Sequence, residues 1–260
     1  MPIIPPVVPP LPRTSPYCRD LPLGSAFDWL GAGWRDLRTD PAASLAYGLV
    51  VFALSLGIVL GLILFGWDYA LFPATAGFLI LAPILAIGLY AKSRALEEGR
   101  HVTLRQMVLP EAPSRGQLLF TGALLSVLML LWMRAAVIIY ALFFGVRPFP
   151  GLDHVAQMLF STGHGLAMLA VGTAVGGLFA AFAFAVSAFS IPMMLDRRVD
   201  ALTAMGTSWA LVWNNLPALL VWGAAVLALV LLSLATGMLG LIIVFPWLGH
   251  ASWHAWRAVR

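Results

Sequence analysis

Six runs of apolar residues, each long enough to cross a lipid bilayer as a helix, dominate the sequence. A hydrocarbon core about 30 Å thick takes about 20 residues of α-helix, which rises about 1.5 Å per residue. The runs are Leu45–Phe65, Phe72–Ala91, Leu118–Gly145, Gly165–Phe189, Leu216–Ala235 and Met238–Trp256. Because lipid offers no hydrogen-bond partners to the backbone, such runs form helices. The sequence therefore predicts an all-α fold, a polytopic bundle of six transmembrane helices within residues 24–260.

The composition agrees with a membrane protein and excludes several other classes. The chain is 61% hydrophobic and 10% charged, whereas soluble domains are about 45–50% apolar and about 25% charged. This rules out a soluble enzyme and a disordered chain. A single cysteine, Cys18, excludes a disulfide framework and a cysteine metal site.

The basic residues predict the orientation. With a cytoplasmic N-terminus, all but two of the 15 Lys and Arg residues fall in cytoplasmic segments. The exceptions are Arg147, which is outside, and Arg134, which lies within the third run. This asymmetry is typical of bacterial inner-membrane proteins, and six spans place both termini in the cytoplasm. The high pI of about 9.7 is thus explained by topology, and we expect no nucleic-acid partner because no basic stripe has interleaved aromatic residues.

Residues 1–23 contain eight prolines. Proline removes a backbone donor and breaks helices, so this segment cannot form a helix or a core. We predict a proline-rich, disordered cytoplasmic tail over 1–23. A docking strand for a partner protein is the alternative.

A short segment with helical apolar spacing precedes each pair of runs. These segments contain residues 27–37, 104–108 and 202–212, with apolar side chains three and four positions apart. Such spacing is typical of a helix that lies in the membrane interface. The sequence therefore predicts three hairpins, each preceded by a cytoplasmic interfacial amphipathic helix.

A shared spacing of proline, aromatic residue and arginine supports a repeat. It occurs in Pro83-Tyr90-Arg94 and in Pro246-Trp253-Arg257. The two prolines lie within runs and predict kinks, either static or acting as hinges. The pairs Gly57 and Gly61, and Gly172 and Gly176, have the small-xxx-small spacing that lets membrane helices approach closely.

The six runs contain no Asp or Glu, and all three glutamates lie in one cytoplasmic loop. Proton-coupled carriers and membrane-embedded acid–base enzymes usually need a buried carboxylate. Its absence from the runs counts against both classes.

Arg134 is the one full charge inside a run. Within a span an arginine is costly and is a functional candidate by default. It lies in the outer half of its run, where it can reach the interface or pair with Asp68 or Asp153. Structural anchoring, contact with a partner protein or lipid phosphate, and a transport site are its three alternatives.

His250 and His254, four residues apart on the last run, could share a metal. Two histidines without a carboxylate or cysteine nearby make a weak metal site. With Trp253 and Trp256 beside them, we interpret them as part of an aromatic and polar interface belt. We therefore predict no metal and no cofactor.

A compact charge cluster, Asp196-Arg197-Arg198, follows the fourth run. It can satisfy a helix terminus, which is the favoured interpretation, or contact a partner. Phosphate-binding glycine loops, nucleophile elbows and zinc-protease helices are all missing from the sequence. We expect a protein without enzymatic activity.

Several stretches resemble a proteobacterial family of predicted integral membrane proteins, domain of unknown function 2189. They are Gly33–Leu37, Asp40–Pro41, Ser44–Gly48, Gly88–Tyr90, Ser93–Arg94, Phe184–Ser187, Ile191–Arg197, Val199–Ala201, Thr207–Ser208 and Val244–His254. The resemblance covers about residues 26–257. It implies a polytopic inner-membrane protein, and it assigns no catalytic residue.

These observations favour an accessory or assembly subunit of a larger membrane complex, with a respiratory or energy-transducing complex as the candidate. The expected partners are the bilayer, other membrane subunits and anionic lipid, with contacts at Arg134, Asp196–Arg198, His250 and His254. A transporter or channel for a small solute is the alternative. An enzyme acting on lipids comes third, because the sequence shows no nucleophile–base pair.

Overall fold

The structure is a computed structural model that describes residues 15–145 and 149–260. Over these residues every regular element is a helix. The elements are α1 (Ser25–Thr39), α2 (Pro41–Leu64), the short 3-10 helix η1 (Asp68–Ala70), α3 (Leu71–Leu85), α4 (Ile87–Glu97), α5 (Leu104–Val108), α6 (Arg115–Phe144), α7 (Leu152–Ser161), α8 (Gly163–Ser187), α9 (Ser190–Asp196), α10 (Ala201–Asn214), α11 (Leu216–Ala235) and α12 (Leu241–Val259).

Five stretches of the described residues are long and apolar enough to cross a membrane. They are Pro41–Leu64, Asp68–Glu97, Arg115–Phe144, Gly163–Asp196 and Leu216–Ala235. They coincide with the first five predicted runs, so the prediction of an all-helical, multi-pass membrane protein is confirmed.

The sixth predicted run, which forms α12, is not among these five stretches. The C-terminal half of α12 carries His250, Ser252, His254 and Arg257. Its apolar N-terminal half made the run resemble a span, but the polar half belongs to a protein interior rather than to lipid. The structure therefore supports five of the six predicted spans, and it does not confirm α12 as the sixth.

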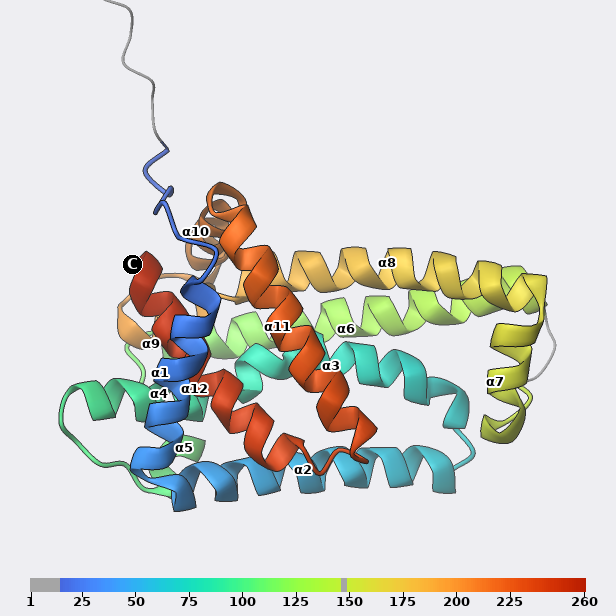
Figure 1. Cartoon of the computed structure of the whole chain (residues 1–260), viewed down its shortest axis with the longest axis horizontal. Helices are drawn as coiled ribbons and strands as arrows, with labels where there is room; N and C mark the ends of the chain where they lie inside the picture. The colour runs from blue at the N-terminus through green and yellow to red at the C-terminus, as the bar shows by residue number, and fades with distance from the viewer. Residues whose placement is uncertain (1–14, 146–148) are drawn as a thin grey trace, which may run out of the picture.

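The long helices α2, α3, α6 and α8 run along the long axis of the molecule (Figure 1). Helices α1, α4, α5, α9 and α10 gather at one end with the C-terminus, and α7 lies at the other. We name these the basic end and the far end. Arg19 Nε donates to the carbonyl of Val259 over 2.8 Å, so both described chain ends lie at the basic end.

The predicted tail is partly ordered. Residues 1–14 lie outside the described residues, but residues 15–23 are attached to the helices. The backbone N–H of Arg19 donates to Asn215 Oδ1 over 2.8 Å, and Asn215 Nδ2 donates to the carbonyl of Tyr17 over 2.8 Å. This part of the segment therefore packs on the start of α11.

The helices contact one another in a cyclic pattern. Helix α5 packs on α4, helix α10 packs on α8 and α9, and helix α1 packs on α12. Helices α4, α9 and α12 contact each other at the basic end. Among the longer helices, α2 packs on α12 and α6 packs on α3, but α11 has no comparable contact with α8. The pair α8 and α11 therefore lacks the direct packing that joins α2 to α12 and α3 to α6.

Close contacts of α12 occur at glycines other than the predicted pairs. A Cβ at Gly48 would lie 2.2 Å from the carbonyl oxygen of Ile242, and one at Gly33 would lie 2.5 Å from the backbone N of Ala251. By contrast, no heavy atom lies within 4 Å of a Cβ built at Gly57 or Gly61. Among the described residues, no other helix packs closely against Gly57 and Gly61.

Proline in α12 explains why Gly48 is needed. Pro246 has no N–H, so the carbonyl of Ile242, four residues earlier, lacks its helical donor. That carbonyl faces Gly48, where only a residue without Cβ lets the α2 backbone approach.

We predict that Gly48→Ala destabilises the protein by about 1–3 kcal/mol, the usual cost of overpacking a tight contact. The added methyl would overlap the Ile242 carbonyl and push α12 away from α2. Gly57→Ala is the matched control on the same helix, and it should leave the melting temperature unchanged or slightly raised. Thermal unfolding in detergent measures both, and equal melting temperatures for the two variants would contradict the assigned contact.

Candidate functional site

A buried histidine joins α2 and α4 at the basic end. The side chain of His250, on α12, is 0% exposed. Its Nε2 lies 2.9 Å from Ser44 Oγ of α2, and its Nδ1 lies 2.8 Å from Ser93 Oγ of α4. Both ring nitrogens are therefore occupied by hydroxyl groups.

The chain of hydrogen bonds continues on both sides of His250. Lys92 Nζ, 1% exposed, donates to Ser44 Oγ over 2.7 Å and to the carbonyl of Asp40. On the other side, Ser93 Oγ donates to Asp36 Oδ2 over 2.6 Å. We call this set, with His254, the buried polar chain; it connects α1, α2, α4 and α12.

His254 completes the buried polar chain. Its Nε2 lies 2.8 Å from Asp36 Oδ2, and both side chains are partly buried. Asp36 therefore accepts from a hydroxyl and an imidazole with one oxygen. The predicted pair of histidines shares the network through Ser93 and Asp36 rather than through a metal.

The donors along the chain determine the state of His250. Lysine has only donors, so Ser44 accepts from Lys92 and its hydroxyl hydrogen points to Nε2 of His250. Ser93 donates to Asp36 and therefore accepts from Nδ1–H. The imidazole is neutral, with its hydrogen on Nδ1.

The pKa values agree with this assignment. Burial, together with the positive charge of Lys92, lowers the pKa of His250 to about 3. Burial alone would raise the pKa of Asp36, but the hydrogen bonds from His254 and Ser93 outweigh it, so the pKa lies below its ordinary value. At neutral pH the chain thus holds a neutral imidazole and a carboxylate.

The buried polar chain contains a serine–histidine hydrogen bond of the kind used by hydrolases. A nucleophile must reach its substrate, yet Ser44, Ser93 and His250 are each 0% exposed. The arrangement instead satisfies polar groups in an apolar interior, where an unpaired one would cost about 1–3 kcal/mol. Its chemical role is to fix four helices relative to one another.

This placement corrects the prediction that His250 contacts a partner or lipid. The prediction treated the last run as a lipid-exposed helix with an interface belt. Because α12 is enclosed by α1, α2 and α4, the ring of His250 faces other helices. His254 likewise faces α1 through Asp36.

The predicted cluster Asp196-Arg197-Arg198 meets the C-terminus. Asp196 Oδ2 accepts from Arg260 over 2.7 Å and from the indole N–H of Trp256 over 3.3 Å. The guanidinium carbon of Arg197 lies 5.2 Å from the centroid of the Trp256 ring. Arg198 is exposed and forms no ion pair within the described residues.

Arg134 lies apart from both groups. It is exposed on α6, and within the described part of the chain it has no ion pair. Asp68, one expected partner, accepts instead from the backbone N–H of Tyr69 over 3.1 Å. The side chain of Asp153, the other expected partner, lies outside what the structure describes.

Sequence reasoning missed four members of the buried polar chain, namely Asp36, Ser44, Lys92 and Ser93. Lys92 was assigned to a cytoplasmic loop because it follows the second run directly. The available signal was that Lys92 continues the apolar run without a break and is itself followed by a serine. Asp36 and Ser44 carry no signal of their own, because only the fold brings them to α4 and α12.

The fold and the site together define a multi-pass integral membrane protein whose helices are joined through polar groups at one end. Residues 71–196, a little under half of the chain, match the family described as predicted integral membrane protein (DUF2189). The resemblance drawn from the sequence is thereby confirmed over this range. Searches of curated proteins and of solved structures found no match.

We predict that stability falls as the pH drops from about 6.5 to about 3. An unfolded histidine takes up a proton near pH 6.5, whereas folded His250 resists protonation until about pH 3. The unfolded state therefore binds more protons in this window, and stability rises with pH. Asp36, with its lowered pKa, adds to the loss only at the acidic end.

The variant His250→Gln tests this, because glutamine can still bridge the two serines but does not titrate. Its melting temperature should depend less on pH between 6.5 and 3, because unfolding then takes up one proton fewer than in the wild type. His101→Gln, at an exposed histidine, is the control and should keep the wild-type dependence. An unchanged slope in His250→Gln would rule out a buried neutral histidine.

Proposed function

We propose that this protein is a non-enzymatic accessory or assembly subunit of a larger membrane complex. The observation that carries the proposal is the free far half of α2. All buried residues of α2 lie in its first half, the last being Val51, and residues 52–64 are partly or fully exposed. Half of a membrane span is thus available to another protein.

The surface of this half suits a partner helix. Gly57 and Gly61 lie one turn apart on it, and no atom lies within 4 Å of a Cβ built at either position. Small residues at this spacing let two helix backbones approach closely in lipid, where packing rather than the hydrophobic effect drives association. Large apolar side chains beside them, Leu54 and Ile58, are each 61% exposed.

The basic end supports the same proposal by a different route. There the helices are fixed by the buried polar chain, which gives a rigid platform from which the far half of α2 projects. Arg134 and Arg198 are exposed and are the candidate contacts for a partner or for anionic lipid. Asp196, His250 and His254 hydrogen-bond within the protein, and Arg197, which is also exposed, lies over the ring of Trp256.

The alternative, a carrier of a small polar solute, needs a polar cavity near the middle of the membrane. The cavity that the helices enclose is lined by apolar side chains, and Arg134 is not among them. The observations therefore favour the accessory role over transport of a polar or anionic solute.

We propose further that the basic end faces the cytoplasm, in the inner membrane, and that the chain forms three hairpins. The hydrogen bond from Arg19 to Val259 holds both described ends together. In the third hairpin α11 leaves the basic end and α12 returns to it. The concentration of arginine at this end supports the cytoplasmic side.

A reporter fused after Arg260 tests the orientation. We expect a cytoplasmic reporter such as a fluorescent protein to be active there, and a phosphatase that requires export to be inactive. The reciprocal fusion, inserted after Trp67 in the turn that follows α2, should give the opposite result. Phosphatase activity at Arg260 would overturn the proposed sidedness.

Association through α2 is tested by the double variant Gly57→Leu, Gly61→Leu. A Cβ at either position meets no atom within 4 Å, so the variant should fold with the wild-type melting temperature yet lose partners that co-purify and crosslink in mild detergent. Gly177→Leu, also in open space but on α8, should keep them. A wild-type protein that remains alone after crosslinking in membranes would contradict the proposed function.

A further inference from the structure

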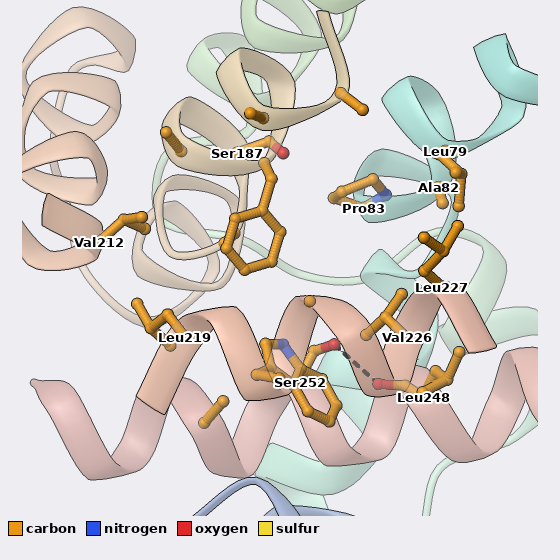
Figure 2. A pocket seen from close by; sticks show the side chains of 18 of the residues that line it. Leu79, Ala82, Pro83, Ser187, Val212, Leu219, Val226, Leu227, Leu248 and Ser252 are labelled. Carbon is orange, nitrogen blue, oxygen red and sulfur yellow. Dashed lines mark hydrogen bonds between the residues drawn. The ribbon is translucent and has the colours of Figure 1, made fainter. Parts of the chain in front are cut away.

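A cavity of about 820 Å³ lies between α3, α8, α10, α11 and α12. Figure 2 shows its wall, with Leu79 and Pro83 on α3, Ser187 on α8, and Leu219 and Leu227 on α11. All of α3, α8 and α11 belong to membrane-spanning stretches. The cavity is therefore at a depth where lipid surrounds the protein.

The cavity lies between α8 and α11, the two helices that lack direct packing. Helix α2 packs on α12 and α6 packs on α3, whereas α11 runs obliquely and has no comparable contact with α8 (Figure 1). The walls on either side of the gap are apolar. Something apolar from the membrane must fill the place of the missing contact, because a void forfeits the packing of its lining.

The wall offers neither a charge nor a free hydroxyl group from its two serines. No residue that lines the cavity is charged. Ser187 Oγ donates to the carbonyl of Ala183 over 2.6 Å, and Ser252 Oγ donates to that of Leu248 over 2.7 Å, the bond drawn in Figure 2. Tyr90 also lines the cavity, and its hydroxyl group is hydrogen-bonded with Ser252. An ionic ligand would leave its charge unpaired here, so the wall favours hydrocarbon.

The volume of the cavity suits a hydrocarbon chain rather than a protein helix. A helix is about 10–12 Å wide and rises 1.5 Å per residue, so ten residues occupy roughly 1,200–1,700 Å³. The cavity holds about 27 non-hydrogen atoms at about 30 Å³ each, the share of one water in the liquid. One acyl chain of about 18 carbons takes roughly 540 Å³ at the same volume per atom and fits within the cavity, whereas ten residues of a transmembrane helix do not.

Two tryptophans indicate how such a chain lies. Trp209 and Trp213 of α10 line the cavity at the basic end, and they are 43% and 67% exposed. Tryptophan favours the level of the lipid headgroups. A headgroup near α10 would let its chain run along α11 toward Leu241, at the inner end of the cavity.

We infer that this cavity binds one acyl chain of a membrane phospholipid, which enters through the gap between α8 and α11. Its headgroup lies at the level of Trp209 and Trp213, where no charged side chain lines the cavity to select an anionic lipid. The site is separate from the free half of α2. The inference therefore goes beyond the proposed function and does not depend on it.

The experiment uses delipidated protein, dioleoyl phosphatidylethanolamine as the probe, and native mass spectrometry. Gly223 lines the cavity from α11, and a Cβ there meets nothing within 4 Å. Gly223→Phe therefore introduces a ring at the cavity wall, with no close contact at its Cβ. Gly57→Phe adds the same side chain in open space on α2 and is the matched control.

We expect wild type and Gly57→Phe to retain one phospholipid per chain, and Gly223→Phe to bind it at least tenfold more weakly. If Gly223→Phe does not fold, Ala181→Phe fills the cavity from α8. No adduct in wild type, an adduct that neither filling variant weakens, or retention only of a prenyl-chain lipid would each overturn the inference. Loss of partners in the α2 variants leaves this result unchanged.

Discussion

An imidazole that is hydrogen-bonded on both sides holds α12 between α2 and α4, and the rest of the structure depends on this arrangement. His250 can bridge Ser44 and Ser93 only if the three helices approach closely. Gly48 permits the approach of α2, and Gly249, where a Cβ would lie 2.5 Å from Leu89, permits that of α4. The glycines and the polar groups require each other, because a helix held further away would leave buried hydroxyls and the Lys92 ammonium without partners.

The polar links are concentrated at one end of the molecule. At the basic end, polar links and close packing fix α1, α2, α4 and α12, and the C-terminus is tied to Asp196 and to Arg19. Toward the far end the spans are held by fewer contacts, and only 11% of the most apolar window of α2 is buried. A protein built in this way presents long apolar surfaces from a rigid base, which suits a role in assembling other membrane components.

The sequence predicted the five spans because lipid allows a long apolar run one structure only, a helix with all its backbone bonds made internally. The sixth span is not confirmed, because the run Met238–Trp256 joins an apolar first half to a second half that carries His250, His254 and other polar residues. The site was harder to predict. His250 and His254 were found from their spacing, but Asp36, Ser44, Lys92 and Ser93 come from three other helices and meet only through tertiary contacts. The paired Gly57 and Gly61 were taken for packing residues, whereas Gly48, which has no partner at that spacing, makes the close contact.

The course of α11 follows from the same buried polar chain. Its first residue comes directly after Asn215, which is hydrogen-bonded to Arg19 and Tyr17 at the basic end. Its last residue is joined to α12 by a short turn in which Gly237 and Met238 adopt positive φ, and Gly240 packs on Ser233. Because α12 is fixed between α2 and α4, the turn must lie beside α2, and α11 must cross obliquely from one fixed point to the other. A helix so constrained cannot also lie against α8, so the cavity beside α8 is a geometric consequence of where His250 finds its partners.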